Sequence, residues 1–327
     1  MAAIHRRSDK WQVRIRRKGF PVEVKTFSIR ADAEQWARSV ETEMDRGGFV
    51  SRSEAEANTL QDIIERYIDE VCPTQRGGAD DIVRLRATCR TKLAKLSIAA
   101  LTPKAIAAYR DERLKKLKPA TVTRELAYLS AIINHARREW DINVTNPVTL
   151  VRKPPATQGR DSVLATDEET RLLAAMVATG RRSIWLLPAA ILSLETAMRR
   201  GELLELRWTN VDLEAQTAYL PITKNGASRT VPLSRRAISI LADLPRSIDG
   251  LVIPVKGNTL HAAFRKACKR ANIGDFHWHD LRHTAITRLS KKLPNLIELA
   301  AVSGHRNLGM LKRYYHPSAT ELAKKLG

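Results

Sequence analysis

The spacing of hydrophobic positions changes along this chain, and each change predicts a different kind of element. Near the N-terminus, Trp11, Val13 and Ile15 alternate with polar or basic residues, and Val22 and Val24 resume the alternation after a glycine turn. Alternation with a period of two is typical of strands that bury one face. The first residues therefore predict two strands of a small sheet.

Helical spacing replaces the alternation beyond the second strand. Asp32 can cap a first helix, and a polar stretch at residues 52–58 separates that helix from a second region. In the second region Thr59 begins a helix, Thr102-Pro103 opens another at its first position, and residues 121–140 form a long third. A sheet-plus-helix unit is thus followed by an all-helical one.

The last part of the chain mixes the two periods. Helical spacing predicts helices over residues 167–179 and 183–206, whereas shorter runs at 219–223 and 229–233 predict strands. The loop between these strands contains a glycine, which is typical of a β-hairpin. Lys224 would then lie at the hairpin tip.

These changes of pattern divide the chain into domains, because one hydrophobic core seldom serves 327 residues. We expect a β-sheet-plus-helix domain (1–55), an all-α domain (59–150), a basic, proline-containing linker (151–160) and a mainly α-helical domain with a small β-sheet (161–327). The predicted fold class is multidomain α+β.

Charge points to a polyanionic partner. The formal net charge is +21, and nine of the first 30 residues are basic while two are acidic. Such a field attracts nucleic acid, although a solvated surface would carry the same residues. The candidate DNA contacts are the basic residues of the first strand region and of the linker: Arg14, Arg16, Arg17, Lys18, Arg152 and Lys153.

Other classes of protein are disfavoured. The longest apolar run, residues 184–194, is short and contains Pro188, so we expect no membrane span, and the basic N-terminus lacks the apolar stretch of a secretory signal. Cys72, Cys89 and Cys268 are too few and too scattered for a disulfide framework or a cysteine zinc site. A reducing, cytoplasmic compartment fits this composition.

Residue types that handle phosphate gather towards the C-terminus. His279 and Arg282 are three residues apart, so they share a helical face and can point at one anion. Tyr314 can supply an oxygen nucleophile, and Arg199 and Lys224 add cations. On a basic chain, this set predicts chemistry on a nucleic-acid backbone.

A metal-free mechanism is favoured. His277, His279 and His283 have spacings that a metal could use, but no thiol or carboxylate cluster completes a ligand set. Without a metal, fixed cations must neutralise the charge that develops on a phosphodiester under attack, and arginine offers the matching planar fork.

Four motifs together resemble the tyrosine recombinases of the phage-integrase family, in the family's order. They are the first arginine box at 196–208 (TAMRRGELLELRW), the lysine hairpin of Lys224 with 229–233 (RTVPL), the second box at 279–284 (HDLRHT), and Ser303-Gly304-His305 with Tyr314 nine residues beyond. The all-α domain also resembles the family's core-binding domain, and the first domain is similar to its arm-binding domains.

The resemblance implies a site-specific recombinase that integrates or excises a phage genome or genomic island. Tyr314 would attack the scissile phosphate, giving a 3′-phosphotyrosyl intermediate and a free 5′-hydroxyl, and Lys224 would protonate the departing oxygen. The ester keeps the energy of the broken bond, so a second DNA end can reverse the step without ATP. No metal or nucleotide cofactor is implied.

The resemblance also assigns the residues around the phosphate. Arg199 and Arg282 would hold its oxygens, and Glu202 would orient Arg199. His279 and His305 would position the phosphate and assist proton transfer. All the residues that the resemblance makes catalytic are present, so an active enzyme is expected.

The sequence departs from the family at two positions. Ala197 stands where glycine is common, and Ser303 where leucine is commoner. A methyl group at position 197 crowds a turn if the backbone there is left-handed, whereas within a helix alanine is the better residue.

Some assignments stay open. The family register selects Arg199 over the adjacent Arg200 and Tyr314 over the adjacent Tyr315. His283 is expected to pack or cap within its own helix rather than to act on substrate.

The implied partners are double-stranded DNA attachment sites and other copies of the chain. Family members act as tetramers on DNA, and a helix at residues 320–326 could dock on a neighbouring protomer. An accessory DNA-bending or directionality factor is also compatible with the resemblance, in the nucleoid of a bacterial cell. The alternatives are a type IB topoisomerase and a non-catalytic DNA-binding factor on the same fold.

Overall fold

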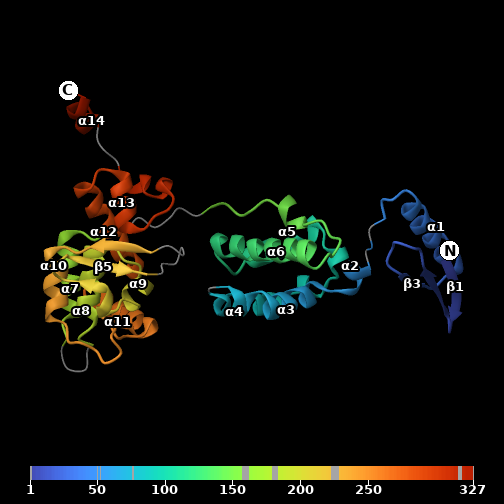
Figure 1. The fold of residues 1–327 in the computed structure, drawn as a ribbon, viewed down its shortest axis with the longest axis horizontal. Helices are drawn as coiled ribbons and strands as arrows, with labels where there is room; N and C mark the ends of the chain where they lie inside the picture. The colour runs from blue at the N-terminus through green and yellow to red at the C-terminus, as the bar shows by residue number, and fades with distance from the viewer. Residues whose placement is uncertain are drawn as a thin grey trace. The chain divides into compact units, whose positions relative to one another are not determined.

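The computed structural model describes residues 2–49, 51, 53–75, 77–156, 162–178, 183–221, 228–315 and 319–326. Backbone contacts divide the chain into two compact units, Met1–Gln158 and Gly159–Gly327 (Figure 1). The first unit contains two separate hydrophobic cores. Helices predominate, with one small antiparallel sheet at the N-terminus and another in the second unit, so the predicted α+β class is confirmed.

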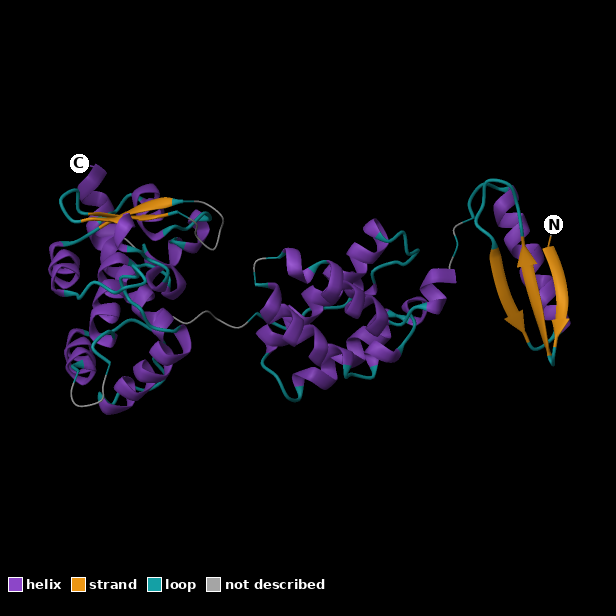
Figure 2. Cartoon of the chain, turned by 60° about the horizontal axis from the view of Figure 1, so that its bottom comes forward, coloured by secondary structure: helices purple, strands orange, loops and turns teal. Residues whose placement is uncertain are grey.

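The N-terminal part is a three-stranded antiparallel sheet with one helix along a face (Figure 2). Its strands follow one another in the order β1 (Ala2–Arg7), β2 (Lys10–Ile15) and β3 (Glu23–Phe27), and α1 (Arg30–Asp45) completes it. The small core between sheet and helix is built from buried side chains of β2 and α1.

The register of β3 contradicts the predicted alternation. Ile15 pairs with Glu23, so the odd-numbered residues of β3 share the core face of β2, and Glu23 is buried. Val22 and Val24 are instead 48% and 46% exposed, and the prediction that they continue the buried face was wrong. Asp32 lies in the first turn of α1 rather than at its cap, where it still complements the helix dipole.

The all-helical part of the first unit confirms both predicted helix starts. Thr59 caps α3 and forms a capping box with Asp62, and the Thr102 hydroxyl accepts a hydrogen bond from the amide of Ala105 at the start of α5. The helices are α2 (Ser53–Ala57), α3 (Leu60–Glu70), α4 (Gly78–Cys89), α5 (Pro103–Leu114) and α6 (Pro119–Glu139), with single 3₁₀ turns at Cys72–Thr74, Leu93–Lys95, Ile98–Ala100 and Pro147–Leu150.

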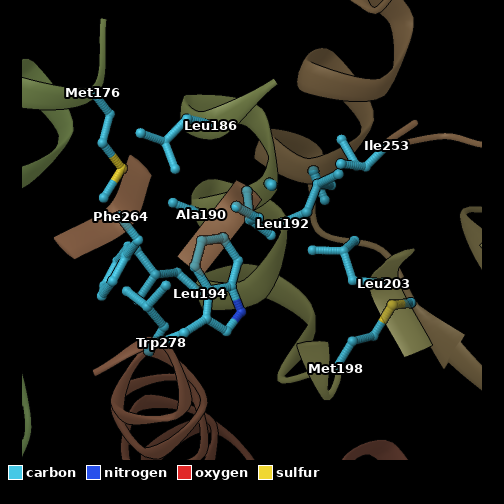
Figure 3. Close-up of a cluster of buried hydrophobic side chains, with 14 of the residues drawn as sticks. Met176, Leu186, Ala190, Leu192, Leu194, Met198, Leu203, Ile253, Phe264 and Trp278 are labelled. Carbon is cyan, nitrogen blue, oxygen red and sulfur yellow. The ribbon is translucent and has the colours of Figure 1, made fainter. Parts of the chain in front are cut away.

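The second unit surrounds a larger core, in which Phe264 and Trp278 lie among aliphatic side chains (Figure 3). Its helices are α7 (Thr166–Met176), α8 (Leu186–Thr196), α9 (Arg200–Leu204), α10 (Arg235–Asp243), α11 (Gly257–Arg270), α12 (Trp278–Lys292), α13 (Leu296–Ser303) and α14 (Ala319–Leu326), with 3₁₀ turns η5 (Trp208–Asn210), η6 (Leu308–Met310) and η7 (Lys312–Tyr314).

A second antiparallel sheet joins β4 (Val211–Asp212), β5 (Thr217–Leu220) and β6 (Arg229–Pro232) in that order. The predicted pairing of the last two strands is confirmed, with Leu220 opposite Arg229. The expected hairpin tip at 222–227, which includes Lys224, lies outside the described residues.

The prediction of a single helix over residues 183–206 was wrong. The helix α8 ends at Thr196, Ala197 adopts a left-handed conformation with φ of 53°, and Arg199 is extended before α9 begins. A left-handed residue cannot continue a right-handed helix, so the chain changes direction there. This break places Arg199 at the start of a new helix.

None of the helices within the described residues is both long enough and apolar enough to span a bilayer.

Candidate active site

A small hydrophobic cluster joins the segments that carry the expected catalytic residues. Ala197, Ala285, Leu299 and Leu311 are completely buried in it, and the Tyr314 ring packs against its edge. These side chains come from the α8–α9 break, α12, α13 and the start of η7. Packing therefore brings together residues that lie more than 100 positions apart in the sequence.

Arg199 is held in place from two sides. Its Nη1 donates to Oε1 of Glu202 at 2.7 Å, and its Nη2 donates to the carbonyl oxygen of Gly304 at 3.2 Å. The Arg199 amide also donates to Oε2 of Glu202 at 2.8 Å. The side chain of the adjacent Arg200 points instead towards the start of α11. Its Cζ lies 3.8 Å from the position that a Cβ atom on Gly257 would occupy. This geometry supports Arg199 as the member of the pair that faces the site.

Glu202 orients a second arginine that the sequence analysis left without a role. Arg229 of β6 donates from Nη1 and Nη2 to the two carboxylate oxygens of Glu202, at 3.0 and 2.7 Å. Burial alone would raise the pKa of Glu202, but hydrogen bonds from Arg229 and Arg199 outweigh it and lower the pKa to about 2. The carboxylate is thus fully ionised between two guanidinium groups.

Arg282 is 3% exposed, and its hydrogen bonds go to the main chain. Its Nη1 donates to the carbonyl of Ala197, and its Nη2 donates to the carbonyl of Ser303 at 2.6 Å. Burial and the nearby Arg199 lower the pKa of this guanidinium to about 9. A phosphate beside these two arginines would relieve that repulsion, so the pair suits an anion.

His279 and His305 are poised as neutral imidazoles. Partial burial, followed by the charges of neighbouring residues, lowers the pKa of each ring to about 4. Nδ1 of His305 lies 2.8 Å from Oγ of Ser303, whose hydroxyl donates to the carbonyl of Leu299. Oγ is therefore best placed to accept Nδ1–H, which leaves Nε2 of His305 as an acceptor.

Tyr314 ends η7 with its hydroxyl against Nδ1 of His283. The two rings are stacked, with centroids 5.8 Å apart and planes at 26°. His279 in turn meets His283 edge-on at 4.9 Å. His283 was predicted to pack or cap within its helix, but its ring stacks on Tyr314, 31 residues away. Its spacing of four residues from His279 already places both rings on one face of the helix.

The remaining candidates fall elsewhere. Lys224 is outside the described residues, so the structure assigns it no position. The candidate DNA contacts Arg14, Arg16, Lys18, Arg152 and Lys153 are exposed, and Arg17 forms an ion pair with Asp45. Over the described residues, no three or more histidine, cysteine or acidic side chains gather in a way that could hold a metal.

Comparison with known proteins identifies the family. Residues 162–321 match the phage integrase family, and residues 56–153 match the N-terminal domain of phage integrases. A shufflon-specific DNA recombinase of Escherichia coli is 41% identical over 277 residues, which cover 82% of this chain and 71% of that protein. The chain belongs to the phage integrase family. The protein is therefore an enzyme of the site-specific recombinase class, as the motifs indicated.

Other relatives are similar over almost the full length of this chain. A putative integrase/recombinase of Haemophilus influenzae is 34% identical over 337 residues, covering 98% of this chain and 89% of that one. Among solved structures, a lambda integrase tetramer bound to a Holliday junction has a TM-score of 0.67 at 21% identity, covering 96% of this chain and 94% of that one. The Tn1549 transposon integrase in complex with circular intermediate DNA has a TM-score of 0.68 at 18% identity, covering 83% and 99%. These structures share the fold.

Proposed function

We propose that this integrase cuts and rejoins double-stranded DNA at defined attachment sites through a 3′-phosphotyrosyl intermediate on Tyr314. The observation that carries the proposal is the meeting of Arg199, Arg282 and the Tyr314 hydroxyl around one small cluster of the second unit. Two cations beside an oxygen nucleophile supply the charge stabilisation and the attacking group that transesterification of a phosphodiester needs, besides an acid for the departing oxygen.

The two arginines form a preorganised clamp. Each is fixed by acceptors other than the substrate: Glu202 and the Gly304 carbonyl for Arg199, and two carbonyls for Arg282. Little reorganisation is then needed when charge develops on the non-bridging oxygens. The neutral ring of His279 can donate a hydrogen bond to those same oxygens. His305, whose Nε2 is an acceptor, is proposed to assist proton transfer, and Lys224 is proposed to protonate the departing 5′-oxygen.

The rest of the chain is proposed to bind DNA. Residues 1–55 would contact arm-type sites and residues 59–150 core-type sites, with the linker at 151–160 between the latter and the catalytic domain at 161–327. The exposed basic residues of the first domain and the linker supply charge for phosphate contacts. Lambda integrase, which shares the fold, has been solved as a tetramer on a Holliday junction, and we propose a tetramer on DNA here as well.

The helix α14 is proposed to join neighbouring protomers. Its Leu326 is 88% exposed, which suits a helix that buries an apolar face in a partner. Deleting the chain after His316 should weaken assembly on DNA more than binding to a single site. Unchanged cooperative assembly in a mobility-shift titration would refute this role.

Two biological outcomes are open to the same chemistry. Integration or excision of a phage genome or genomic island is the first, in keeping with relatives named as integrases. Inversion of a DNA segment, which the same strand exchange gives between inverted sites, is the second, and a DNA recombinase named shufflon-specific is 41% identical. Plasmids that carry paired sites in direct or inverted orientation separate them, because excision requires direct repeats and inversion requires inverted repeats.

The chemical proposal is tested with a nicked suicide substrate made from the DNA that borders the element carrying the gene. Wild type and Tyr314→Phe are incubated with it in chelator, with Tyr315→Phe as the matched control, and covalent protein–DNA adducts are resolved on a denaturing gel. Adducts from wild type and Tyr315→Phe alone support Tyr314 as nucleophile. Adducts from Tyr314→Phe point to another residue, and binding without any adduct favours a non-catalytic factor.

A further inference from the structure

We propose that His283 is a catalytic residue, and that its Nδ1 takes the phenolic proton of Tyr314 as the tyrosine attacks the phosphate. The inference rests on the proposed function and adds to it the group that activates the nucleophile. A phenol is a weak nucleophile until its proton leaves, so a base in contact with the hydroxyl has a direct effect on rate.

The geometry of the pair carries the proposal. Nδ1 of His283 lies within hydrogen-bonding distance of Oη of Tyr314, and the near-parallel rings keep the two atoms side by side. The contact joins positions 31 residues apart, on α12 and η7. Tertiary structure, and not local sequence, therefore places this imidazole on the nucleophile.

Both partners are anchored to the same helix. His283 is a half-buried residue of α12, and the hydroxyl of Ser290, two turns further along α12, donates to the carbonyl oxygen of Tyr314 at 2.8 Å. The cluster below the site also holds Leu311 at the start of η7. A fixed backbone on each side keeps the base and the nucleophile aligned, which is what proton transfer requires.

His279 is placed for a different task. Its ring meets His283 edge-on, one turn earlier on α12, and the charges of Arg282 and Arg199 act on it, so we place it towards the phosphate. Partial burial and the cations around it keep the ring neutral by lowering its pKa to about 4, which makes it a poor base. We therefore assign different roles to the two histidines: His279 contacts the phosphate, and His283 accepts the phenolic proton.

The proposed step exchanges one bond at phosphorus for another and moves two protons. The bond from Oη of Tyr314 to phosphorus forms while the bond from phosphorus to the 5′-oxygen breaks. The phenolic proton moves to Nδ1 of His283, and the departing 5′-oxygen takes a proton from Lys224, the proposed acid. The resulting imidazolium gains a neighbour in the anionic phosphate, which offsets repulsion from Arg282. When a 5′-hydroxyl attacks the phosphotyrosyl ester, its own proton passes to Lys224 and the proton on His283 returns to Oη.

The test separates a base from an acid through the leaving group. Single-turnover adduct formation is measured with the suicide substrate in two forms, one with the normal 5′-oxygen and one with sulfur in its place, since a thiolate departs without an acid. His283→Asn keeps a hydrogen-bonding group near the position of Nδ1 but cannot take a proton. His277→Asn, on the cap of the same helix with a half-exposed ring, is the matched control.

We expect His283→Asn to slow adduct formation roughly 10²–10⁴-fold on both substrates, the range typical of a lost general base. Its rate should approach that of wild type at alkaline pH, where the phenol ionises unaided, and His277→Asn should match wild type throughout. Equal rates for wild type and His283→Asn, or rescue by the sulfur substrate, would overturn the proposal. A wild-type protein that forms no adduct would instead overturn the proposed function, and unchanged DNA binding and thermal unfolding show that a slow variant is folded.

Discussion

A Cβ atom on Gly304 would stand 2.6 Å from Nη1 of Arg229, so the guanidinium of Arg229 would have to move. Gly304 ends α13 in a left-handed conformation, with φ of 70°, and its carbonyl oxygen accepts a hydrogen bond from Arg199. The same residue thus leaves room for one arginine and holds the other. The chain between Ser303 and His305 is as much a part of the clamp as the arginines themselves.

Replacing Gly304 by alanine should damage both stability and activity. The left-handed backbone costs a non-glycine residue about 1–2 kcal/mol, and the new methyl group would push Arg229 away from Glu202. We expect a loss of at least that free energy of unfolding in urea, together with slower adduct formation. Gly201→Ala is the control, because Gly201 lies within α9 with open space around it, so alanine there should be neutral or stabilising.

Removing Arg229 should leave a buried charge poorly compensated. The side chains of Arg229 and Glu202 are 9% and 5% exposed, and breaking a buried ion pair from one side costs about 3–5 kcal/mol. Arg229→Met should therefore approach the lower end of that range, since Arg199 still contacts the carboxylate. The double variant with Glu202→Gln should recover part of the loss, and additive losses in the double-mutant cycle would contradict the coupling.

Glu202 should make stability depend on acid pH. Its pKa is about 2 in the folded protein against an ordinary value of 4.5, so the unfolded chain binds more protons between these values. The stabilisation, on the order of 3 kcal/mol, is complete above pH 4.5 and disappears as the pH falls towards 2. The difference in unfolding free energy between wild type and Glu202→Gln should shrink over that interval, whereas a constant difference would argue against the ionised carboxylate.

His279 and His305 should stay neutral well below the usual histidine range. With the pKa of each near 4, their ring protons should not shift in an NMR titration from pH 8 down to about pH 5. Asn substitutions at each position assign the two signals among the eight histidines. A ring that titrates near pH 6.5 would show that the site is more hydrated than its packing indicates. Binding of DNA should raise both pKa values, because the phosphate offsets the charges of Arg282 and Arg199.

Local signals in the sequence were sufficient wherever neighbours in the chain decide the structure. The starts of α3 and α5 followed from Thr59 and Thr102, whose hydroxyl groups bond to amides three residues on. In β3 the same kind of reasoning failed, because valine positions suggested one face while pairing with β2 buried Glu23 on the other. Strand register depends on the partner strand, which a single pattern does not contain.

The sequence supplied the residue types of the candidate site but not their geometry. The hydrophobic run through α8 and α9 concealed the turn at Ala197, whose carbonyl is used by Arg282, 85 residues away. The sequence motif that contains Arg229 did not reveal its role, because its partner Glu202 lies 27 residues away in the chain. The sequence indicated only that His283 lies in a helix, and its contact with Tyr314 became evident from the structure. Contacts of this range arise only from tertiary packing.

The acceptors that fix Arg282 are the carbonyl oxygens of Ala197 and Ser303, and every amino acid carries that atom. A change of side chain at Ala197 or Ser303 therefore leaves the acceptor in place. Loss of one residue from either turn would move the carbonyl and misdirect the guanidinium, while every side chain proposed to be catalytic remained. A shortened homologue of this kind would keep the full signature of an integrase and still be inactive.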